Sequence, residues 1–227
     1  MEQSWLPGMR GRGGHRVGAG RPKKKGLRRA SHLRRRSFRK GALHVTVRRA
    51  EGLPSMRTPE ARRLVVKALR RSAWRFGMGV VQYSVQSNHV HLVVEARDER
   101  ALSQGMQGLL VRWSRALNVL WQRRGKVWAE RYFAQLVTNP TAMRNTLGYV
   151  LKNAMRHGVR LGREVVDPYS SGRWFAGWRE GDLSLTAPLD SPVVEARFWL
   201  LREGWYRAGL ISIYGAPGRH RAVRRVG

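Results

Sequence analysis

The sequence contains no cysteine. Disulfide bonds, thiolate metal sites and cysteine nucleophiles are therefore excluded. Long apolar runs are missing too, because no stretch approaches the roughly 20 residues that a membrane-spanning helix needs. No apolar segment follows the basic amino terminus, as it would in a secretory signal. We therefore expect a cytoplasmic protein without a membrane partner, associated with the nucleoid if it binds DNA.

Acidic residues are scarce. The chain of 227 residues has 14 Asp and Glu against 45 Lys and Arg, a formal net charge of +31. A protein this basic needs a polyanionic partner, and nucleic acid is the leading candidate. Most of the basic residues are arginine, which binds phosphate and guanine through paired hydrogen bonds. Charge alone does not argue for catalysis, because a structural RNA-binding protein has the same balance.

Composition divides the chain into three regions. Residues 1–41 are rich in Gly and Arg with almost no apolar periodicity, and we expect a disordered basic arm there. Residues 42–160 carry the periodic apolar patterns of a folded domain. Residues 161–227 form an extension with turn residues, aromatic residues and a basic end. Its tryptophans could stack on unpaired bases or pack the extension against the domain.

The basic arm contains one motif, Gly-Arg-Pro-Lys-Lys at residues 20–24, which resembles the core of an AT-hook. Such a core lays arginine into the minor groove of DNA. Arg21, Lys23 and Lys24 are therefore candidate DNA contacts. The alternative is that this run makes nonspecific phosphate contacts, which is the commoner role of such segments.

Hydrophobic periodicity in the middle region predicts alternating strands and helices. The expected strands are residues 42–48, 80–86, 89–95 and 133–137, and the expected helices are residues 59–76, 99–123 and 139–158. Strand, helix, strand, strand, helix, strand is the order of the ferredoxin-like split βαβ arrangement. We therefore expect an α+β fold with a four-stranded antiparallel sheet and one helix appended after it. A short helix over residues 194–207 is also expected.

Two histidines, His89 and His91, lie two residues apart in a run of apolar residues. Successive side chains alternate faces in a strand, so both imidazoles project from one face while Val90, Leu92 and Val94 fill the other. Histidine is a common ligand of metal ions. The pattern therefore indicates a metal site at the edge of a core, although packing or hydrogen bonding would explain two histidines equally well.

The helix expected at residues 139–158 carries a tyrosine that its apolar stripe does not explain. At 100° per residue, Tyr149 lies roughly 140° from the centre of that stripe. Asn153, one turn later, points to nearly the same side, and Arg156 and His157 extend this polar face. An ordinary amphipathic helix with an exposed tyrosine and asparagine is the alternative. The stripe itself consists of Met143, Leu147, Val150, Leu151 and Ala154.

Together these two segments resemble the single-tyrosine HUH endonucleases, and more closely their REP-associated tyrosine transposase branch. The resemblance rests on Asn-His-Val-His at residues 88–91 and on Tyr-Val-Leu-Lys-Asn-Ala-Met-Arg at 149–156. Residues 126–133, Lys-Val-Trp-Ala-Glu-Arg-Tyr-Phe, are similar to the family's Gly-x-Leu-Trp-x-x-Arg-Phe stretch. The chain departs from the family pattern at Ala154, where proline is usual, and at residues 86–87, where Gln-Ser replaces Met-Pro. The resemblance covers roughly residues 42–178.

The resemblance implies a metal-dependent transposase. In the family the paired histidines bind a divalent ion, here His89 and His91 with Mg²⁺ or Mn²⁺, and the helical tyrosine, here Tyr149, attacks single-stranded DNA. In related transposases a polar side chain one turn later, here Asn153, completes the metal site. Attack leaves a 5′-phosphotyrosine and a free 3′-hydroxyl. The expected partner is single-stranded or hairpin DNA, and the expected state is a monomer, although some relatives dimerise.

Other residues compete for these roles or assist them. Tyr83 and Tyr132 are alternative nucleophiles. We expect Tyr83 to be a core residue and Tyr132 to belong to the stretch before the last strand. DNA affinity is expected from arginines along the domain: Arg70, Arg71, Arg112, Arg115, Arg131 and Arg156. Two other functions stay open. The first is a replication initiator or relaxase, for which a chain of this length shows no helicase domain, and the second is a basic DNA- or RNA-binding protein without catalysis.

Overall fold

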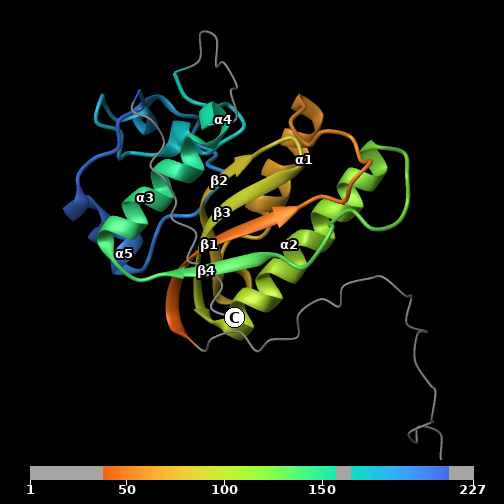
Figure 1. Ribbon diagram of the computed structural model, residues 1–227, viewed down its shortest axis with the longest axis horizontal. Helices are drawn as coiled ribbons and strands as arrows, with labels where there is room; N and C mark the ends of the chain where they lie inside the picture. The colour runs from red at the N-terminus through yellow and green to blue at the C-terminus, as the bar shows by residue number, and fades with distance from the viewer. Residues whose placement is uncertain (1–37, 157–164, 215–227) are drawn as a thin grey trace, which may run out of the picture. The chain divides into compact units, whose positions relative to one another are not determined.

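The computed structural model describes residues 38–156 and 165–214. Its centre is one antiparallel sheet of four strands in the order β2-β3-β1-β4 (Figure 1). The fold is the α+β, ferredoxin-like split βαβ arrangement that the sequence predicts. The elements are β1 (Arg39–Arg48), α1 (Pro59–Arg70), β2 (Met78–Val85), β3 (His89–Asp98), α2 (Glu99–Leu120), β4 (Phe133–Val137), α3 (Pro140–Leu151), α4 (Asn153–Arg156) and α5 (Trp199–Arg202).

The three long helices start at the capping residues that the sequence provides. Thr58, Asp98 and Asn139 each accept a hydrogen bond from the backbone N–H three residues later, at 3.2, 2.7 and 2.8 Å. Proline follows the cap at the start of α1 and of α3, where its missing N–H is not needed. Local chemistry thus fixes these starting points.

The end of α1 differs from the expectation. The helix stops at Arg70, whereas periodicity predicts that it continues to residue 76. Trp74, Phe76 and Gly77 have φ values of 48°, 57° and 76°, which is left-handed backbone that cannot continue a right-handed helix. The chain turns here into β2 through a short 3-10 segment, Arg75–Gly77.

One face of the sheet is apolar, and α1 and α2 cover it. Alternate residues of the central strands point into this core. Trp113 of α2 is fully buried there and donates a hydrogen bond from its indole N–H to the carbonyl of Val65 at 3.3 Å. The buried strand residues of this face are Leu43, Val45 and Val47 of β1 and Val90, Leu92 and Val94 of β3.

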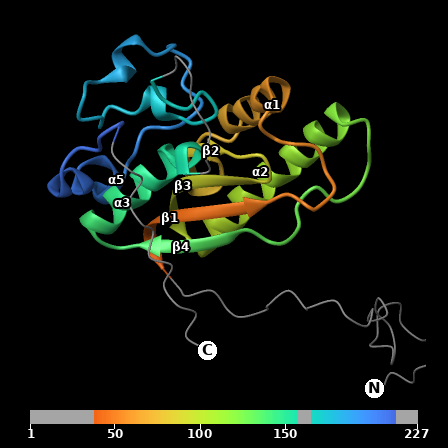
Figure 2. The same cartoon turned by 45° about the horizontal axis from the view of Figure 1, so that its top comes forward.

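The opposite face packs against α3 and against the carboxyl-terminal segment (Figure 2). Here the apolar side chains of α3 meet Ala42 of β1 and Val93 of β3. Seven of the fifteen buried members of this second core come from beyond residue 165: Val166, Phe175, Trp178, Leu201, Trp205, Ile211 and Ile213. Among the expected aromatic residues of the extension, Phe175 and Trp178 are therefore packed into the fold.

The same carboxyl-terminal segment covers the outer edge of β2. Val85 donates its backbone N–H to Tyr169 at 2.9 Å, and Ser171 donates to Tyr83 at 3.0 Å. Further along, Val194 donates to Val80 at 3.0 Å. An edge strand exposes unpaired backbone groups, and these bonds satisfy some of them on β2.

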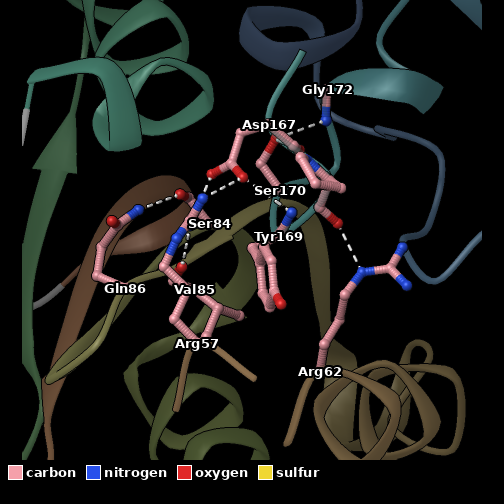
Figure 3. A network of polar contacts seen from close by, with 10 residues as sticks. Arg57, Arg62, Ser84, Val85, Gln86, Asp167, Tyr169, Ser170 and Gly172 are labelled. Carbon is pink, nitrogen blue, oxygen red and sulfur yellow. Dashed lines mark hydrogen bonds and ion pairs between the residues drawn. The ribbon is translucent and has the colours of Figure 1, made fainter. Parts of the chain in front are cut away.

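A buried ion pair anchors this segment (Figure 3). Arg57 donates two hydrogen bonds to the carboxylate of Asp167, at 2.7 and 3.0 Å, and a third to the carbonyl of Val85 at 2.9 Å. The Arg57 guanidinium also lies 4.5 Å from the ring centre of Tyr169. Asp167 is 1% exposed, so the paired geometry is needed to offset the loss of water around both charges. The network thereby joins the segment to β2.

None of the helices in residues 38–156 and 165–214 is long and apolar enough to cross a membrane. The expected basic arm, with Arg21, Lys23 and Lys24, lies outside the described residues, as do His157 and the expected end of the third helix at residue 158.

Candidate active site

The face of the sheet that meets α3 carries a row of polar side chains across its central strands. In the strand register, His91 of β3 lies opposite Thr46 of β1 on one side and Ser84 of β2 on the other, and His89 lies opposite Arg48. Directly opposed residues of antiparallel strands share a face and place their Cβ atoms about 5 Å apart. His91, His44 and Ser84 are buried, which polar side chains accept only with hydrogen-bond partners.

Hydrogen bonds hold the two imidazoles of β3. Nδ1 of His91 lies 3.0 Å from Nε2 of His44 and 3.1 Å from Oγ1 of Thr46. Nδ1 of His89 lies 2.7 Å from Oδ1 of Asn88. The two Nε2 atoms of His89 and His91 face each other at 3.0 Å. Each ring is thus held by hydrogen bonds at its Nδ1 atom, and the Nε2 atoms of the two rings point toward each other.

Tyr149 of α3 lies against this cluster. Its ring centre is 5.1 Å from that of His91 and 5.7 Å from that of His44, and both contacts are edge-on at 74°. The side chain of Tyr149 is partly exposed. The structure therefore brings the helical tyrosine and the histidine strand together on one face, as the sequence interpretation requires.

The two competing tyrosines lie on the other side of the sheet. Tyr83 and Tyr132 are buried in the core that α1 and α2 cover. Burial raises the pKa of Tyr83 to about 12, and its hydroxyl has no hydrogen-bond partner among the described residues. A phenol that is hard to ionise and closed off from solvent is poorly suited to attack a phosphate.

The tyrosine helix is shorter than expected. α3 ends at Leu151, and Lys152, with φ −106° and ψ 15°, separates it from α4. Nζ of Lys152 donates to the carbonyl of Ser212 at 2.9 Å, and burial lowers the pKa of this lysine. The prediction of one continuous helix is wrong at this residue, where the chain also contacts the carboxyl-terminal segment. Asn153 therefore starts a second helical turn.

Asn153 is fully buried, and neither atom of its side-chain amide has a hydrogen-bond partner in the described part of the chain. An unsatisfied buried polar group costs about 1–3 kcal/mol. Native proteins keep such groups where an ion, a water molecule or a ligand satisfies them. The amide of Asn153 therefore has unused capacity for a ligand beside the tyrosine helix.

These donors suit a small divalent cation. Ligands at right angles on an octahedral ion with bonds of about 2.1 Å lie about 3 Å apart, which matches the separation of the two Nε2 atoms. Ligating histidines ordinarily bond to a supporting group through their other nitrogen, as both do here. No group of three or more His, Cys, Asp or Glu residues in the described ranges forms a metal site. An ion would therefore need Asn153 or substrate oxygens as further ligands.

The predicted DNA-contacting arginines are dispersed. Arg70 and Arg71 at the end of α1, and Arg112 and Arg115 of α2, come from the helices on the far side of the sheet. Arg70 donates to the backbone carbonyl and the carboxylate of Asp190, and Arg112 donates to Ser72. Arg71, Arg115 and Arg131 are exposed, and only the backbone of Arg156 is described.

His44 and Thr46 are the site residues that the sequence interpretation missed. Both stand in the first strand between apolar residues, on the side away from Leu43, Val45 and Val47. In a split βαβ sheet the first and third strands are neighbours, so the polar side of β1 must adjoin the histidines of β3. The alternation of polar and apolar residues in β1, together with the strand order of the fold, could therefore have identified His44 and Thr46.

Comparison with known proteins agrees with this geometry. Residues 44–153 match the family model described as Transposase IS200 like. The matched span runs from His44 on β1 to Asn153 after the tyrosine helix. Residues 44–153 are thus similar to IS200-like transposases, the class expected from the motifs. Transposases cleave DNA, so this similarity points to a DNA-cleaving enzyme.

A solved transposase structure shows the same fold. A REP-associated tyrosine transposase bound to a REP hairpin is 17% identical, with a TM-score of 0.50, and the match covers 62% of this chain and 82% of that chain. A putative transposase from Deinococcus radiodurans is also 17% identical, with a TM-score of 0.38, 55% of this chain and 92% of that one being covered. No curated protein matches the sequence.

Proposed function

We propose that this protein is a single-strand DNA endonuclease and strand transferase whose nucleophile is Tyr149. The observation that carries the proposal is the contact of the Tyr149 ring with His91 and His44 on the polar face of the sheet. The tyrosine comes from a helix after the fourth strand and the histidines from two central strands. Tyr149 also packs against the apolar core of this face, so the helix holds its ring beside the histidines.

The chemistry is a phosphodiester exchange. The phenolic oxygen of Tyr149 forms a bond to phosphorus while the bond from phosphorus to the 3′-oxygen breaks. The phenolic proton is released and the 3′-oxygen gains a proton, which leaves a 5′-phosphotyrosine and a free 3′-hydroxyl. Because one ester replaces another, a 3′-hydroxyl can attack in reverse and rejoin strands without an energy source.

His89, His91 and Asn153 would hold a Mg²⁺ or Mn²⁺ ion, which when bound polarises the scissile phosphate and stabilises its developing charge. His44 and Thr46 orient His91 through its Nδ1 atom, and Asn88 orients His89. Tyr149 supplies the nucleophile from α3. Each residue thus has one role, and the two imidazoles are positioned before the substrate arrives.

We further propose a hairpin-containing single strand as the substrate and an activity like that of the REP-associated branch. The solved REP-associated transposase that shares this fold is bound to a REP hairpin, and the net charge of +31 suits a nucleic-acid substrate. A monomer is sufficient for the chemistry, because Tyr149 contacts His91 within one chain.

The proposal is tested by trapping the covalent intermediate. The full chain is incubated with Mn²⁺ and a 3′-labelled pool of hairpin oligonucleotides with randomised single-stranded flanks, and the products are separated under denaturing conditions. We expect a labelled protein adduct that disappears with EDTA and with Tyr149→Phe. The label must be at the 3′ end, because the tyrosine keeps the 5′ end of the downstream fragment.

Tyr83→Phe is the matched control. The hydroxyl that it removes has no partner in the described structure, so this variant folds and keeps the adduct. An adduct that persists in Tyr149→Phe would overturn the assignment of the nucleophile. A wild-type protein that binds the pool but never forms an adduct would support a binding protein without catalysis.

A further inference from the structure

Phe133 is an aromatic side chain left open beside the site. It is the first residue of β4 and is 63% exposed. In the strand register it lies directly opposite Thr46, whose Oγ1 is 3.1 Å from Nδ1 of His91. Phe133 therefore shares the polar face with the histidines and is separated from His91 by one strand.

The distance from this ring to the chemistry is short on the scale of a DNA strand. Neighbouring strands lie about 4.8 Å apart, so the backbones at His91 and Phe133 are about 10 Å apart. A stacked single strand advances 3.4 Å per nucleotide, so about three nucleotides span this distance. β4 is an edge strand, so a nucleic-acid strand that leaves the site on this side crosses it.

The charges around Phe133 favour a polyanion. Arg48, opposite His89, and Arg131, two residues before Phe133, are both exposed. Glu130 is the exposed acidic residue next to them in the chain. Exposed aromatic rings on a sheet with cationic neighbours are the means by which many proteins bind unpaired bases, because stacking tolerates any base and the cations contact phosphates.

We propose that Phe133 stacks an unpaired base within about three nucleotides of the scissile phosphate and thereby sets the position of the strand over Tyr149. The buried aromatic of the preceding position, Tyr132, has a different role, because it packs into the opposite core. The inference depends on the proposed function, since it needs a single strand to lie on this face.

The test is a double-mutant cycle between the ring and a base. Binding is measured by fluorescence anisotropy in the Tyr149→Phe background, so that no cleavage occurs. The probe is the fluorescein-labelled hairpin recovered as an adduct or, if none forms, the strongest binder of the pool. Phe133→Ala is expected to weaken binding about 5- to 150-fold, and Phe133→Trp to restore it.

The same probe is then made with one abasic site at each flanking position. For the protein that keeps Phe133, one abasic position should weaken binding as much as Phe133→Ala does with the intact probe. In the Phe133→Ala variant the same abasic position should cause no further loss of affinity. Phe76→Ala is the matched control, because Phe76 is also exposed, at 49%, but lies by α2. It should leave binding unchanged.

The inference would be overturned if, for every abasic site, the fold-loss of affinity in Phe133→Ala equalled the product of the two separate losses. Unchanged binding of Phe133→Ala would overturn it as well. The adduct assay separates this failure from that of the proposed function. If the adduct forms but Phe133 has no effect on binding, only the base-stacking role of Phe133 is refuted. If neither the adduct nor binding is observed, the proposed function is refuted and the role of Phe133 with it.

Discussion

The two faces of the sheet have different kinds of side chain and different means of burial. On the face under α1 and α2 every inward residue of the central strands is apolar, and burial alone explains it. On the face under α3 the central strands bury His44, His91 and Glu95, and the adjoining strand β2 buries Ser84. Polar groups weaken a core unless they are paired. The second face therefore combines paired polar side chains with an apolar core.

The faces are also completed by different parts of the chain. Every buried member of the apolar core lies between Leu43 and Tyr132. The core on the polar face depends on α3 and on residues as distant as Ile213. The first core thus takes all its buried members from the domain, with Tyr169 and Val193 of the later segment only partly buried against it, whereas the second core takes buried members from that segment.

The largest expected effect separates two neighbours on β3. Leu92→Ala, on the apolar face, should lower the free energy of unfolding by about 2–5 kcal/mol, because it leaves a cavity in a closed core. The folded fraction should still form the DNA adduct. Urea unfolding and adduct yield per folded molecule measure the two effects.

His91→Ala, one residue away, should do the reverse: the adduct is lost while most of the stability remains. If instead both variants lose stability equally and keep the adduct, the two faces do not differ in function, and the histidines serve packing.

A smaller effect is expected from Thr46→Val, which keeps the shape of the side chain and removes the hydroxyl that contacts Nδ1 of His91. Loss of a group that supports a metal-ligating histidine costs about 10- to 100-fold in metal affinity or activity. Titrating Mn²⁺ in the adduct assay should show a higher metal requirement with an unchanged adduct yield at saturation.

Thr138→Val, at an exposed position after β4, is the control and should titrate like the wild type. A Thr46→Val variant with unchanged metal requirement would remove Thr46 from the site and leave its hydroxyl a structural role.

The mildest test uses the pH dependence of stability. Glu95 is buried on the polar face, where its carboxylate accepts hydrogen bonds from the backbone N–H groups of Arg197 and Phe198 at 2.8 and 2.9 Å. Burial raises the pKa of Glu95 above its ordinary value of 4.5, although these bonds oppose the rise. The folded state therefore retains a proton that the unfolded chain releases at lower pH.

The sign of the effect follows directly. The contribution of Glu95 is full below the ordinary carboxyl pKa and declines as the pH rises through the raised value of the folded state. Unfolding free energies measured from pH 4 upward should fall more in the wild type than in Glu95→Gln, which cannot titrate. Parallel pH profiles for the two proteins would contradict this account.

Much of the fold was predictable because its signals are local. Alternation placed the strands and their faces, and Thr58, Asp98 and Asn139 marked the helix starts. The break at Lys152 was not predictable from periodicity, and the hydrogen bond from Lys152 to Ser212 joins residues far apart in the chain. The sequence interpretation also extended α1 too far, since the left-handed residues near Phe76 leave no periodic signal.

The candidate site was predictable in part. His89, His91 and Tyr149 were identified from spacing, the stripe and the family resemblance, and their proximity in space required the fold. His44 was missed, because a single histidine in a strand has no motif to identify it. The roles of Asn153 and of the basic residues stay predictions, and for Arg21, Lys23 and Lys24 so does their placement.

The dependence of the polar face on Ile213 has a consequence for synthesis. Ribosomes add about 5–20 residues per second, so roughly 4–16 seconds separate the appearance of Tyr132 from that of Ile213. The apolar side of the sheet has all its buried residues at the start of this interval. Only a nascent chain that has reached Ile213 has the complete core beside Tyr149. A chain that stops within this interval would thus have the apolar core but lack part of the core that packs beside Tyr149.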